Sequence, residues 1–416
     1  MRIAVVGAGI SGLVAAYLLD REHEVTVFEA GAKVGGHTNT IRVDTEYETH
    51  HVDTGFIVFN DRNYPNFERL LARLGVASQP SQMSFGVSDG TGGFEYCSVS
   101  PNGLFATRRH IVSPRFHHML VEVRRFQREA RALLTRGDSD PSLGEWLEQL
   151  RFSRLFIDRM IVPQASAVWS ADPGQMWSFP ARFLVSFFEN HGVLHLRDRP
   201  KWRTVKGGSQ TYVDALTAGF ADRIRVATPV HAIERHDDHV TIKPRGGEAE
   251  SYDHVIVAAH SNQALGMLAD ASDREHEILG AIPYQPNEAV LHTDQRLLPL
   301  RRRAWASWNY HLGGEPSDRT RVTYHMNRLQ ALSADREFCV TLNRSEAIDP
   351  ERVIKTIQYD HPVYTSDGAA AQQRHEEISG TSRRTHYCGA YWGWGFHEDG
   401  VVSALRVCER LGARLT

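Results

Sequence analysis

The stretch MRIAVVGAGISGLVAAYLLDREHEVTVFEAGAKVGGHTNT, residues 1–40, decides the fold. Its residues Arg2–Val6 form a short, mostly apolar and β-branched run that is typical of a buried strand. The glycine-rich segment Gly7–Gly12 follows, and after it a helical pattern continues to Leu19. A second strand, Val25–Phe28, leads to the acid Glu29, 22 positions after the first glycine. This order predicts a βαβ unit with a G-x-G-x-x-G turn.

In such a unit each residue type has a physical role in binding a dinucleotide. Gly7 permits the tight turn, Gly9 lets the backbone approach the pyrophosphate, and Gly12 lets the helix pack closely on the strand. The free N–H groups and the positive dipole end of the helix favour the phosphates. The Glu29 carboxylate can accept from ribose hydroxyls and repels a 2′-phosphate. Glycines alone would also suit an ordinary turn, but the strands, the helix and the acid together favour dinucleotide binding.

The residues after Glu29 distinguish FAD from NAD. Lys33-Val34-Gly35-Gly36-His37 places a glycine pair where a nicotinamide enzyme normally begins its next helix. This continuation resembles the flavin-containing amine oxidase superfamily, which includes monoamine and polyamine oxidases, protoporphyrinogen oxidase and phytoene desaturases. The resemblance implies FAD, and we expect it to be bound non-covalently because no cysteine stands at an obvious attachment point. Lys33 and His37 occupy positions where the family often has arginine, so bidentate contacts are not expected.

Two later segments extend the resemblance. Val52–Phe56 resembles the segment that returns beneath the flavin in this family, although an ordinary strand entered through a turn has the same pattern. Farther along, short strands around Val230 and a buried strand, Val255–Ala259, resemble the second cofactor segment of the family. The resemblance implies that backbone near Val230 meets the adenine.

The stretch THYCGAYWGWGFHEDG, residues 385–400, resembles the segment with which the family closes its FAD site. A strand is predicted to meet Gly389, and a helix to start at Gly400. The resemblance implies that the N-terminus of this helix points at the flavin ring, where its dipole stabilises the reduced anion. The family usually has an acid directly after the glycine, whereas this chain has Ala390. Asp399 or Glu398 is the expected substitute.

The predicted fold is α/β, a Rossmann-like FAD-binding domain of the amine oxidase type with an inserted mixed α+β substrate domain. We assign residues 1–76, 205–265 and 376–416 to the FAD-binding domain and residues 77–204 and 266–375 to the substrate domain. The predicted cofactor-binding residues are Gly7, Gly9, Ile10, Ser11, Gly12, Glu29, Ala30, Lys33, Gly35, Gly36, His37, Thr38, Gly55, Phe56, Val230, Gly389, Ala390, Asp399, Gly400 and Val401.

Composition narrows the classes of function and location. The 416 residues include 47 basic and 50 acidic side chains, a formal net charge of -3, which gives no electrostatic case for binding nucleic acid. The four cysteines show no C-x-x-C spacing, and the first apolar run is too short for a secretory leader. We therefore expect a cytoplasmic protein. Arg301–Arg303 is expected to form a solvated turn, with peripheral contact to anionic membrane lipids as the alternative.

The block AVWSADPGQMWSFPARFLVSFFENHGVLHLRDRPKW, residues 167–202, concentrates aromatic side chains. It predicts either an ordinary core or an apolar substrate chamber over the flavin. His191 and His195, with Glu189 nearby, lack a third ligand at a suitable spacing, so we expect no metal. The candidate catalytic side chains, chosen by their place in the sequence, are His37, His191, His397 and Lys201.

Three functions follow from these observations. GFHEDG, residues 395–400, most resembles a bacterial subgroup of NAD/FAD-binding oxidoreductases associated with acyl-modifying enzymes such as cyclopropane fatty acid synthases. The predicted function is an FAD-dependent oxidoreductase that takes a hydride from a C–H bond of an apolar or lipid substrate, oxidising or desaturating an acyl chain, with O2 as a candidate acceptor. The first alternative is an amine oxidase, although the aromatic blocks carry few acids. The second is a non-catalytic flavoprotein that partners a lipid-modifying enzyme.

Overall fold

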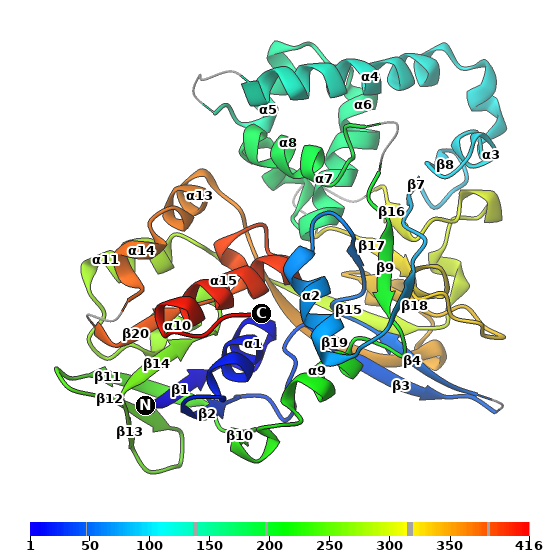
Figure 1. Cartoon of the computed structure of the whole chain (residues 1–416). Helices are drawn as coiled ribbons and strands as arrows, with labels where there is room; N and C mark the ends of the chain where they lie inside the picture. Colours follow the sequence, from blue (N-terminus) through cyan, green and yellow to red (C-terminus); the bar gives the residue numbers. More distant parts are fainter. Residues whose placement is uncertain (47, 136–139, 196–198, 314–318, 381–382, 416) are drawn as a thin grey trace.

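The computed structural model describes residues 1–46, 48–135, 140–195, 199–313, 319–380 and 383–415. A parallel five-stranded sheet in the order β10-β2-β1-β14-β20 organises one half of the molecule (Figure 1). Its strands come from widely separated parts of the chain, because parallel neighbours need long crossover connections. They are β1 (Arg2–Val6), β2 (Glu24–Phe28), β10 (Ile224–Arg225), β14 (His254–Val257) and β20 (Thr385–Tyr387).

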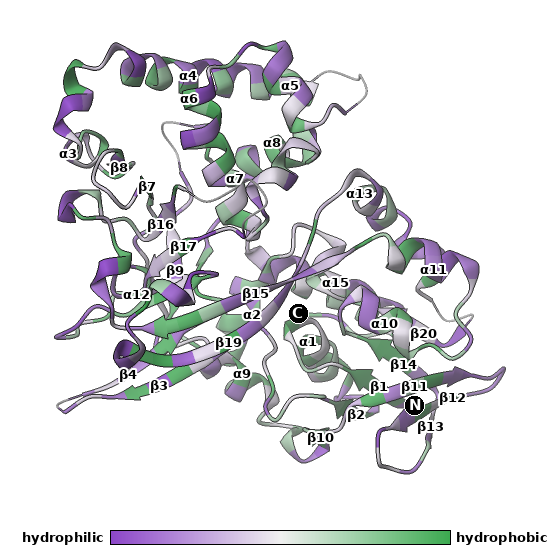
Figure 2. Ribbon diagram, turned by 180° about the vertical axis from the view of Figure 1, so that it is seen from behind, coloured by the Kyte–Doolittle hydropathy of each residue, from purple (hydrophilic) through white to green (hydrophobic). Residues whose placement is uncertain are grey.

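Both faces of this sheet are covered, as its apolar strands require (Figure 2). Ile3 and Val5 of β1 pack against one group of helices, whereas Ala4 and Val6 pack on the opposite side. The helices of the first group are α1 (Ile10–Leu19), α2 (Pro65–Leu74), α9 (Gln210–Thr217) and α15 (His397–Arg410). The opposite side packs on an antiparallel sheet of β11 (Val230–Arg235), β12 (Val240–Pro244) and β13 (Glu250–Tyr252), with α10 (Ser261–Met267), α11 (Asp273–Gly280), α13 (Ser366–Gln372) and α14 (His375–Ile378).

The other half of the molecule is built on a seven-stranded sheet in the order β19-β15-β18-β17-β16-β7-β8. All its neighbouring strands run antiparallel except β16 and β7. The strands are β7 (Phe85–Ser88), β8 (Glu95–Cys97), β15 (Tyr284–His292), β16 (Trp308–His311), β17 (Val322–His325), β18 (Cys339–Leu342) and β19 (Val353–Pro362). The smaller sheets consist of β3 (Thr40–Asp44) with β4 (Thr49–Asp53), and of β5 (Phe59–Asn60), β9 (Trp202–Val205) and β6 (Ser78–Pro80).

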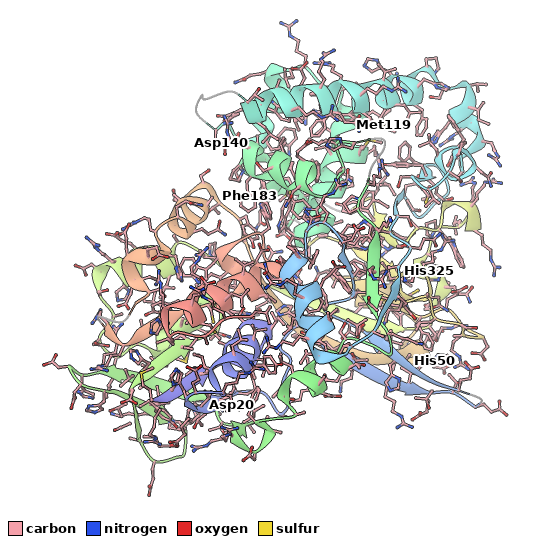
Figure 3. The ribbon with its side chains drawn as sticks, in the orientation of Figure 1. Asp20, His50, Met119, Asp140, Phe183 and His325 are labelled. Carbon is pink, nitrogen blue, oxygen red and sulfur yellow. The ribbon has the colours of Figure 1, made fainter. Side chains whose placement is uncertain are left out.

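A helical region lies beyond this sheet, farthest from the parallel sheet (Figure 1). Met119 of α4 is fully buried in its core and Phe183 of α8 packs against that core (Figure 3). The helices of this region are α3 (Pro101–Leu104), α4 (Pro114–Thr135), α5 (Leu143–Gln149), α6 (Arg154–Phe156), α7 (Val162–Trp169) and α8 (Ala181–Asn190), and α12 (Met326–Leu329) follows β17. Within the described part of the chain, no helix combines the length and apolar character needed to cross a bilayer.

The predicted α/β fold with a Rossmann-like sheet is confirmed. One element prediction is corrected. The C-terminal helix begins at His397 instead of Gly400, because Asp399 already caps the Phe396 N–H group at 2.9 Å. In the segment Val52–Phe56, strand β4 ends at Asp53, so the alternative of an ordinary strand does not hold for the last three residues, which belong to a loop. The division of the chain into an FAD-binding and a substrate domain stays a proposal, and all five parallel strands lie in segments assigned to the first.

Candidate active site

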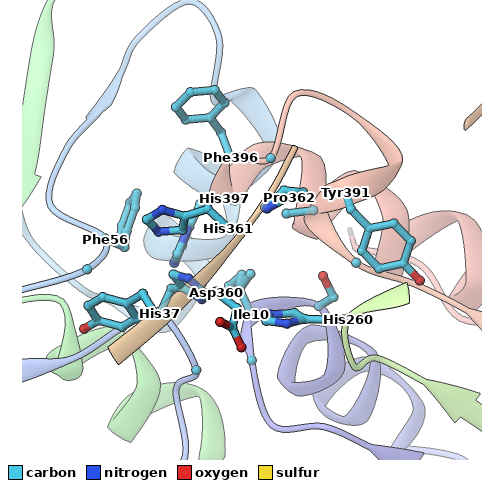
Figure 4. A pocket seen from close by; sticks show the side chains of 18 of the residues that line it. Ile10, His37, Phe56, His260, Asp360, His361, Pro362, Tyr391, Phe396 and His397 are labelled. Carbon is cyan, nitrogen blue, oxygen red and sulfur yellow. The ribbon is translucent and has the colours of Figure 1, made fainter. Parts of the chain in front are cut away.

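A cavity of about 670 Å³ lies between the carboxyl end of the parallel sheet and the seven-stranded sheet (Figure 4). The loops that follow β1, β2 and β14 line one side of it, as expected for a ligand site at the carboxyl ends of parallel strands. Residues of β16, β17 and β19 line the other side. The cavity therefore joins a nucleotide cleft to a second chamber.

The glycine turn after β1 forms the floor of the nucleotide cleft. Gly7 has a φ of +107°, and a Cβ there would lie 2.7 Å from the Ala258 carbonyl oxygen. Gly9 faces open space, with no heavy atom within 4 Å of a Cβ built on it. It is also the N-cap of α1 and has no side chain to cap the first N–H groups of the helix. These N–H groups are available to an anion such as a pyrophosphate.

Glu29 stands at the end of β2, on the rim of the same cleft. Its Oε2 accepts the Ala8 N–H and its Oε1 accepts the Gly31 N–H, both at 2.7 Å. Each carboxylate oxygen has a further lone pair for a hydroxyl donor. Glu29, Ala30 and Val230 all line the cleft. This arrangement suits a ribose and its base.

The glycine pair lies beside the loop that contains Phe56. Gly36 packs close to Gly9, and a Cβ on Gly36 would lie 3.1 Å from the Gly9 Cα. The Phe56 N–H donates to the His37 carbonyl at 2.8 Å, and a Cβ on Gly55 would overlap that carbonyl oxygen. The two segments therefore enter the cavity side by side, although the sequence separates them.

The C-terminal segment closes the cleft with a second helix N-terminus. Gly389 and Ala390 line the cavity after β20. A Cβ on Gly400 would lie 2.8 Å from Ile10 Cγ2 and 2.9 Å from Ser11 Oγ, so the first turns of α15 and α1 touch. The positive dipole ends of both helices converge on the cavity.

Six predicted cofactor residues are not among those that line the cavity, and each has a structural contact instead. Lys33 Nζ donates to Asn39 Oδ1, and Thr38 Oγ1 lies 2.5 Å from the Tyr212 hydroxyl. Asp399 is occupied as a helix cap, and burial raises its pKa to about 7. The others, Gly12, Gly400 and Val401, pack between helices and strands. Ala390 therefore has no acid replacement, because Glu398 also points away and accepts from the Phe67 N–H at 2.9 Å.

Three imidazoles from distant parts of the chain meet in the middle of the cavity (Figure 4). The ring centroid of His37 lies 5.4 Å from that of His361 and 6.1 Å from that of His260. Burial lowers the pKa of all three, and the neighbouring imidazoles lower the pKa of His37 and His361 further. All three rings are therefore neutral near pH 7.

Hydrogen bonds assign the His361 tautomer. Asn343 Nδ2 donates to Asn287 Oδ1 at 2.8 Å, which leaves Asn287 Nδ2 as a donor to His361 Nδ1 at 3.1 Å. A neutral His361 then carries its proton on Nε2. His37 stacks on Tyr359 and has no hydrogen bond to any described residue on either ring nitrogen.

Sequence reasoning missed His260 and His361. His260 could have been predicted, because it follows the predicted strand Val255–Ala259 at the edge where parallel strands place ligand-binding residues. His361 was not, because its position depends on the pairing of β19 with β15, where it lies opposite Gln285.

The predicted catalytic residues divide into two pairs. His37 and His397 line the cavity. His397 stacks on Phe56 with centroids 3.5 Å apart, and burial lowers its pKa to about 3. His191 lies behind the wall and stacks on Phe187, whereas Lys201 is exposed and its N–H donates to Asp61. The last two predictions are wrong in position, because sequence proximity to the aromatic block did not bring these side chains to the cavity.

His195 Nε2 lies 2.8 Å from Glu189 Oε1, whereas His191 Nδ1 lies 3.0 Å from the Phe187 carbonyl. Across the described residues, no group of three or more side chains of His, Cys, Asp or Glu is arranged to hold a metal. Glu189 and His195 thus contact each other, and both side chains are partly exposed.

The second chamber has aromatic and aliphatic walls. Val168 and Trp169 of α7 line it, together with Tyr324 of β17. Trp169 is the member of the predicted aromatic block that reaches the cavity, and most of the others pack in the core behind it. Trp308 Nε1 and the Tyr364 hydroxyl are buried lining groups with no hydrogen-bond partner among the described residues. Such donors are costly unless a ligand satisfies them.

These residues fit FAD. The open side of Gly9 and the two helix N-termini suit the pyrophosphate, and Glu29 suits the adenosine ribose. Trp308 and Tyr364 offer unpaired donors to the far end of the cofactor or to a substrate. When bound, FAD would supply the capacity to accept a hydride, that is, two electrons and a proton.

Comparisons with known proteins agree with this arrangement. The family profile described as "Flavin containing amine oxidoreductase" matches residues 10–323. A Mycobacterium tuberculosis protein, assigned as the flavin-containing monoamine oxidase AofH, is 28% identical over 274 residues, 62% of this chain and 56% of the relative. The chain therefore spans little more than half the length of this curated relative. An L-amino acid oxidase of Cerastes cerastes is 52% identical over 46 residues, 11% of this chain and 9% of that protein.

Solved structures share the fold over nearly the whole chain. Cyclohexylamine oxidase from Brevibacterium oxydans has a TM-score of 0.69 at 14% identity, covering 99% of both chains. A protein from Exiguobacterium assigned as a protoporphyrinogen oxidase has a TM-score of 0.68 at 20% identity, covering 99% of this chain and 98% of that one. A fatty acid isomerase from P. acnes that produces CLA has a TM-score of 0.67 at 18% identity, covering 98% of both.

At such low identities, the similarity to solved structures establishes the fold alone. The family profile covers most of the chain and therefore establishes the family. The superfamily that both ends of the sequence resemble is confirmed, and with it the flavin cofactor FAD. The chain belongs to the flavin-containing amine oxidoreductase family.

Proposed function

We propose that the protein is an FAD-dependent oxidoreductase that takes a hydride from a C–H bond of an apolar substrate, and that this substrate is a fatty acyl chain. The composition of the second chamber carries the proposal. Glu29 in the nucleotide cleft and Asp360 beside His361 are the acids among the described lining residues. An acyl chain gains about 0.8 kcal/mol per buried CH2 group in such a chamber, whereas a buried cation needs an opposing charge.

The chain's own residues have three tasks in this reaction. The aromatic walls hold the substrate C–H bond in place and exclude water. His361 donates through Nε2 to an oxygen of the substrate. His37 accepts a proton, because its ring is neutral and neither nitrogen is bonded to a described residue.

Amine oxidation is the second candidate. It is favoured by the family profile and by the assignment of the Mycobacterium tuberculosis relative as a monoamine oxidase. In that case Asp360 is the acid closest to the imidazoles, and the amine reacts in its neutral form.

We also propose a partner enzyme, an electron acceptor and a cellular location. The resemblance of residues 395–400 to a subgroup associated with cyclopropane fatty acid synthases supports an acyl-modifying enzyme as a partner. O2 is the proposed electron acceptor, and oxygen uptake during turnover would identify it. Four buried, unpaired cysteines support a reducing, cytoplasmic location.

Anaerobic mixing of the purified flavoprotein with candidate substrates tests the proposal. We expect a total phospholipid extract to bleach the flavin band, and putrescine, spermidine and cyclohexylamine to leave it unchanged. Bleaching by the amines alone would contradict the proposal in favour of amine oxidation. A flavin that neither set reduces would favour the non-catalytic partner.

A pair of variants makes the test specific to the chamber. V168E places a charge on the chamber wall, whereas V402E places the same charge on an exposed position of α15. We expect V168E to slow bleaching by lipid at least tenfold and V402E to leave it unchanged. Equal rates in both variants would show that the acyl chain does not enter this chamber.

A further inference from the structure

The outer surface of the helical region carries arginine and aliphatic side chains together. We call it the basic face and define it as the exposed side chains of residues 108–128 and 300–303. Helix α4 forms its length, at the edge of the molecule farthest from the parallel sheet (Figure 1). Its exposed arginines are Arg108, Arg109, Arg115, Arg124, Arg128, Arg302 and Arg303.

Aliphatic side chains stand out from the same face. Val112 is 81% exposed, Val121 and Leu300 are each 65% exposed, and Ile111 is 50% exposed. These four are among nine large apolar side chains exposed in the described part of the chain, so the apolar exposure is concentrated here.

The two segments of the face are joined through the turn between β7 and β8. Arg109 donates to the Gly93 carbonyl, and Arg301 donates to the Gly92 carbonyl at 2.7 Å. Arg303 donates to the Ala106 carbonyl at 3.0 Å, just before the short turn that carries Ile111. The face is therefore one continuous surface.

The charge of the face is almost entirely positive. Residues 108–128 contain six arginines and one acid, Glu122, which is buried and accepts the Ser153 N–H. Among the arginines of residues 108–128 and 300–303, described ion pairs engage only Arg128 with Glu129 and Arg301 with Glu95, and Arg301 is only partly exposed. The rest of the chain must carry the balancing negative charge, since the net charge is -3.

We propose that the basic face docks the protein on the surface of an anionic lipid bilayer. Arginines then meet lipid phosphates, while Ile111, Val112 and Leu300 enter the boundary between headgroups and acyl chains. A nucleic acid would use the same charges, but its phosphate backbone would gain little from the exposed aliphatic side chains beside them. This inference goes beyond the proposed function and does not depend on which substrate reduces the flavin.

Co-sedimentation with vesicles tests the proposal on the intact 416-residue chain with its flavin. The probes are vesicles of phosphatidylglycerol and phosphatidylcholine in equal parts, and vesicles of phosphatidylcholine alone. We expect binding to the first and at least tenfold weaker binding to the second, with the difference lost at 1 M salt. Equal binding to both, or to neither, would overturn the proposal.

Two variants separate the charge from the aliphatic side chains. R108E/R115E/R124E should weaken binding to anionic vesicles about 100-fold, since each arginine near a charged surface contributes roughly a factor of five. I111S/V112S keeps the charge and should weaken binding about tenfold. All five positions are exposed, so an unchanged flavin spectrum and melting temperature would confirm folding.

Matched controls lie outside the basic face. R21E/R245E/R414E makes the same change in net charge at exposed positions on the half with the parallel sheet, and V226S/V353S removes exposed aliphatic groups after β10 and at the start of β19. Both should bind like the wild type. If a control variant lost as much vesicle binding as the face variants do, the proposal would be overturned. Full-strength binding of I111S/V112S to anionic vesicles would also overturn it and would favour an acidic macromolecule as the partner.

Discussion

At His37, burial and three neighbouring imidazoles hold the ring neutral at the centre of the cavity. A proton acceptor in this position contributes roughly 10²- to 10⁴-fold to a reaction that breaks an X–H bond. We therefore expect H37Q to slow anaerobic flavin reduction at least 100-fold. FAD affinity, measured by fluorescence titration, should change by less than tenfold.

H191Q and K201M are the controls for this prediction. His191 lies behind the chamber wall and Lys201 on the surface, so both variants should reduce flavin within threefold of the wild-type rate. If H37Q instead loses FAD, and the fraction that still holds FAD is reduced at the wild-type rate, then His37 binds the cofactor and does not accept the proton.

Residues of the site differ in how far the sequence could predict them. The glycines of the nucleotide cleft were predictable, because their steric reasons are local: Gly7 needs a positive φ, and a side chain on Gly12 would overlap Gly7. Lys33 was not, because nothing local tells whether its flexible side chain reaches a phosphate or, as here, Asn39. His361 depends on a strand pairing between residues far apart in the chain.

At the scale of elements, the close contact between α1 and α15 is the feature most open to test. A Cβ on Gly400 would press on both Ile10 and Ser11. We expect G400A to separate the two helix N-termini, weaken FAD binding at least tenfold and lower the melting temperature. Isothermal titration and thermal scans of the apoprotein measure both effects.

G266A is the matched control for G400A. Gly266 lies in α10 with nothing within 4 Å of a built Cβ, so alanine should be neutral or stabilise the helix by up to about 1 kcal/mol. If G400A binds FAD as tightly as G266A does, the two helix ends do not jointly form the cofactor site.

Glu398 joins two elements by capping α2 from α15. Its carboxylate accepts the N–H groups of Asn66 and Phe67 at 3.1 and 2.9 Å. A glutamine has one acceptor oxygen, so E398Q should lower the free energy of unfolding by about 1–2 kcal/mol in urea titrations. E145Q is the control, because a glutamine can preserve the local capping box of α5. If E398Q and E145Q lowered the free energy of unfolding equally, the cap that Glu398 of α15 places on α2 would add no stability beyond that of a local capping box.

Elements with local signals were predictable from sequence, whereas long-range pairing was not. Short connections and a glycine turn join β1, α1 and β2, so these consecutive elements also pack next to one another. The seven-stranded sheet has no such signal: β19 is mostly polar and mostly exposed or half-buried along its length. The true start of α15 was missed because Asp399 was expected at the cofactor, whereas it caps the helix.

At the scale of the whole molecule, buried histidines make stability depend on pH. Burial lowers the pKa values of six histidines outside the cavity to about 3 or about 4; these are His110, His191, His292, His311, His375 and His386. Between pH 6.5 and 4 the unfolded chain binds more protons at these sites than the folded chain does. Asp53 and Asp399 act in the opposite direction, because burial raises both pKa values to about 7, and burial also raises the pKa values of Glu68, Asp172 and Glu398. The six histidines, with those of the cavity, outnumber these acids.

The free energy of unfolding should therefore fall as the pH drops from 6.5 to 5, which urea titrations at constant ionic strength measure. H292N removes one such group and should reduce this fall by about 2 kcal/mol, because a pKa of about 4 leaves the folded ring neutral over the whole interval. Its asparagine can still accept the Asp294 N–H that His292 Nδ1 accepts at 3.0 Å. H231N, at an exposed position, should leave the pH dependence unchanged. If H292N and the wild type lose the same stability over this interval, His292 is not the source of the pH dependence.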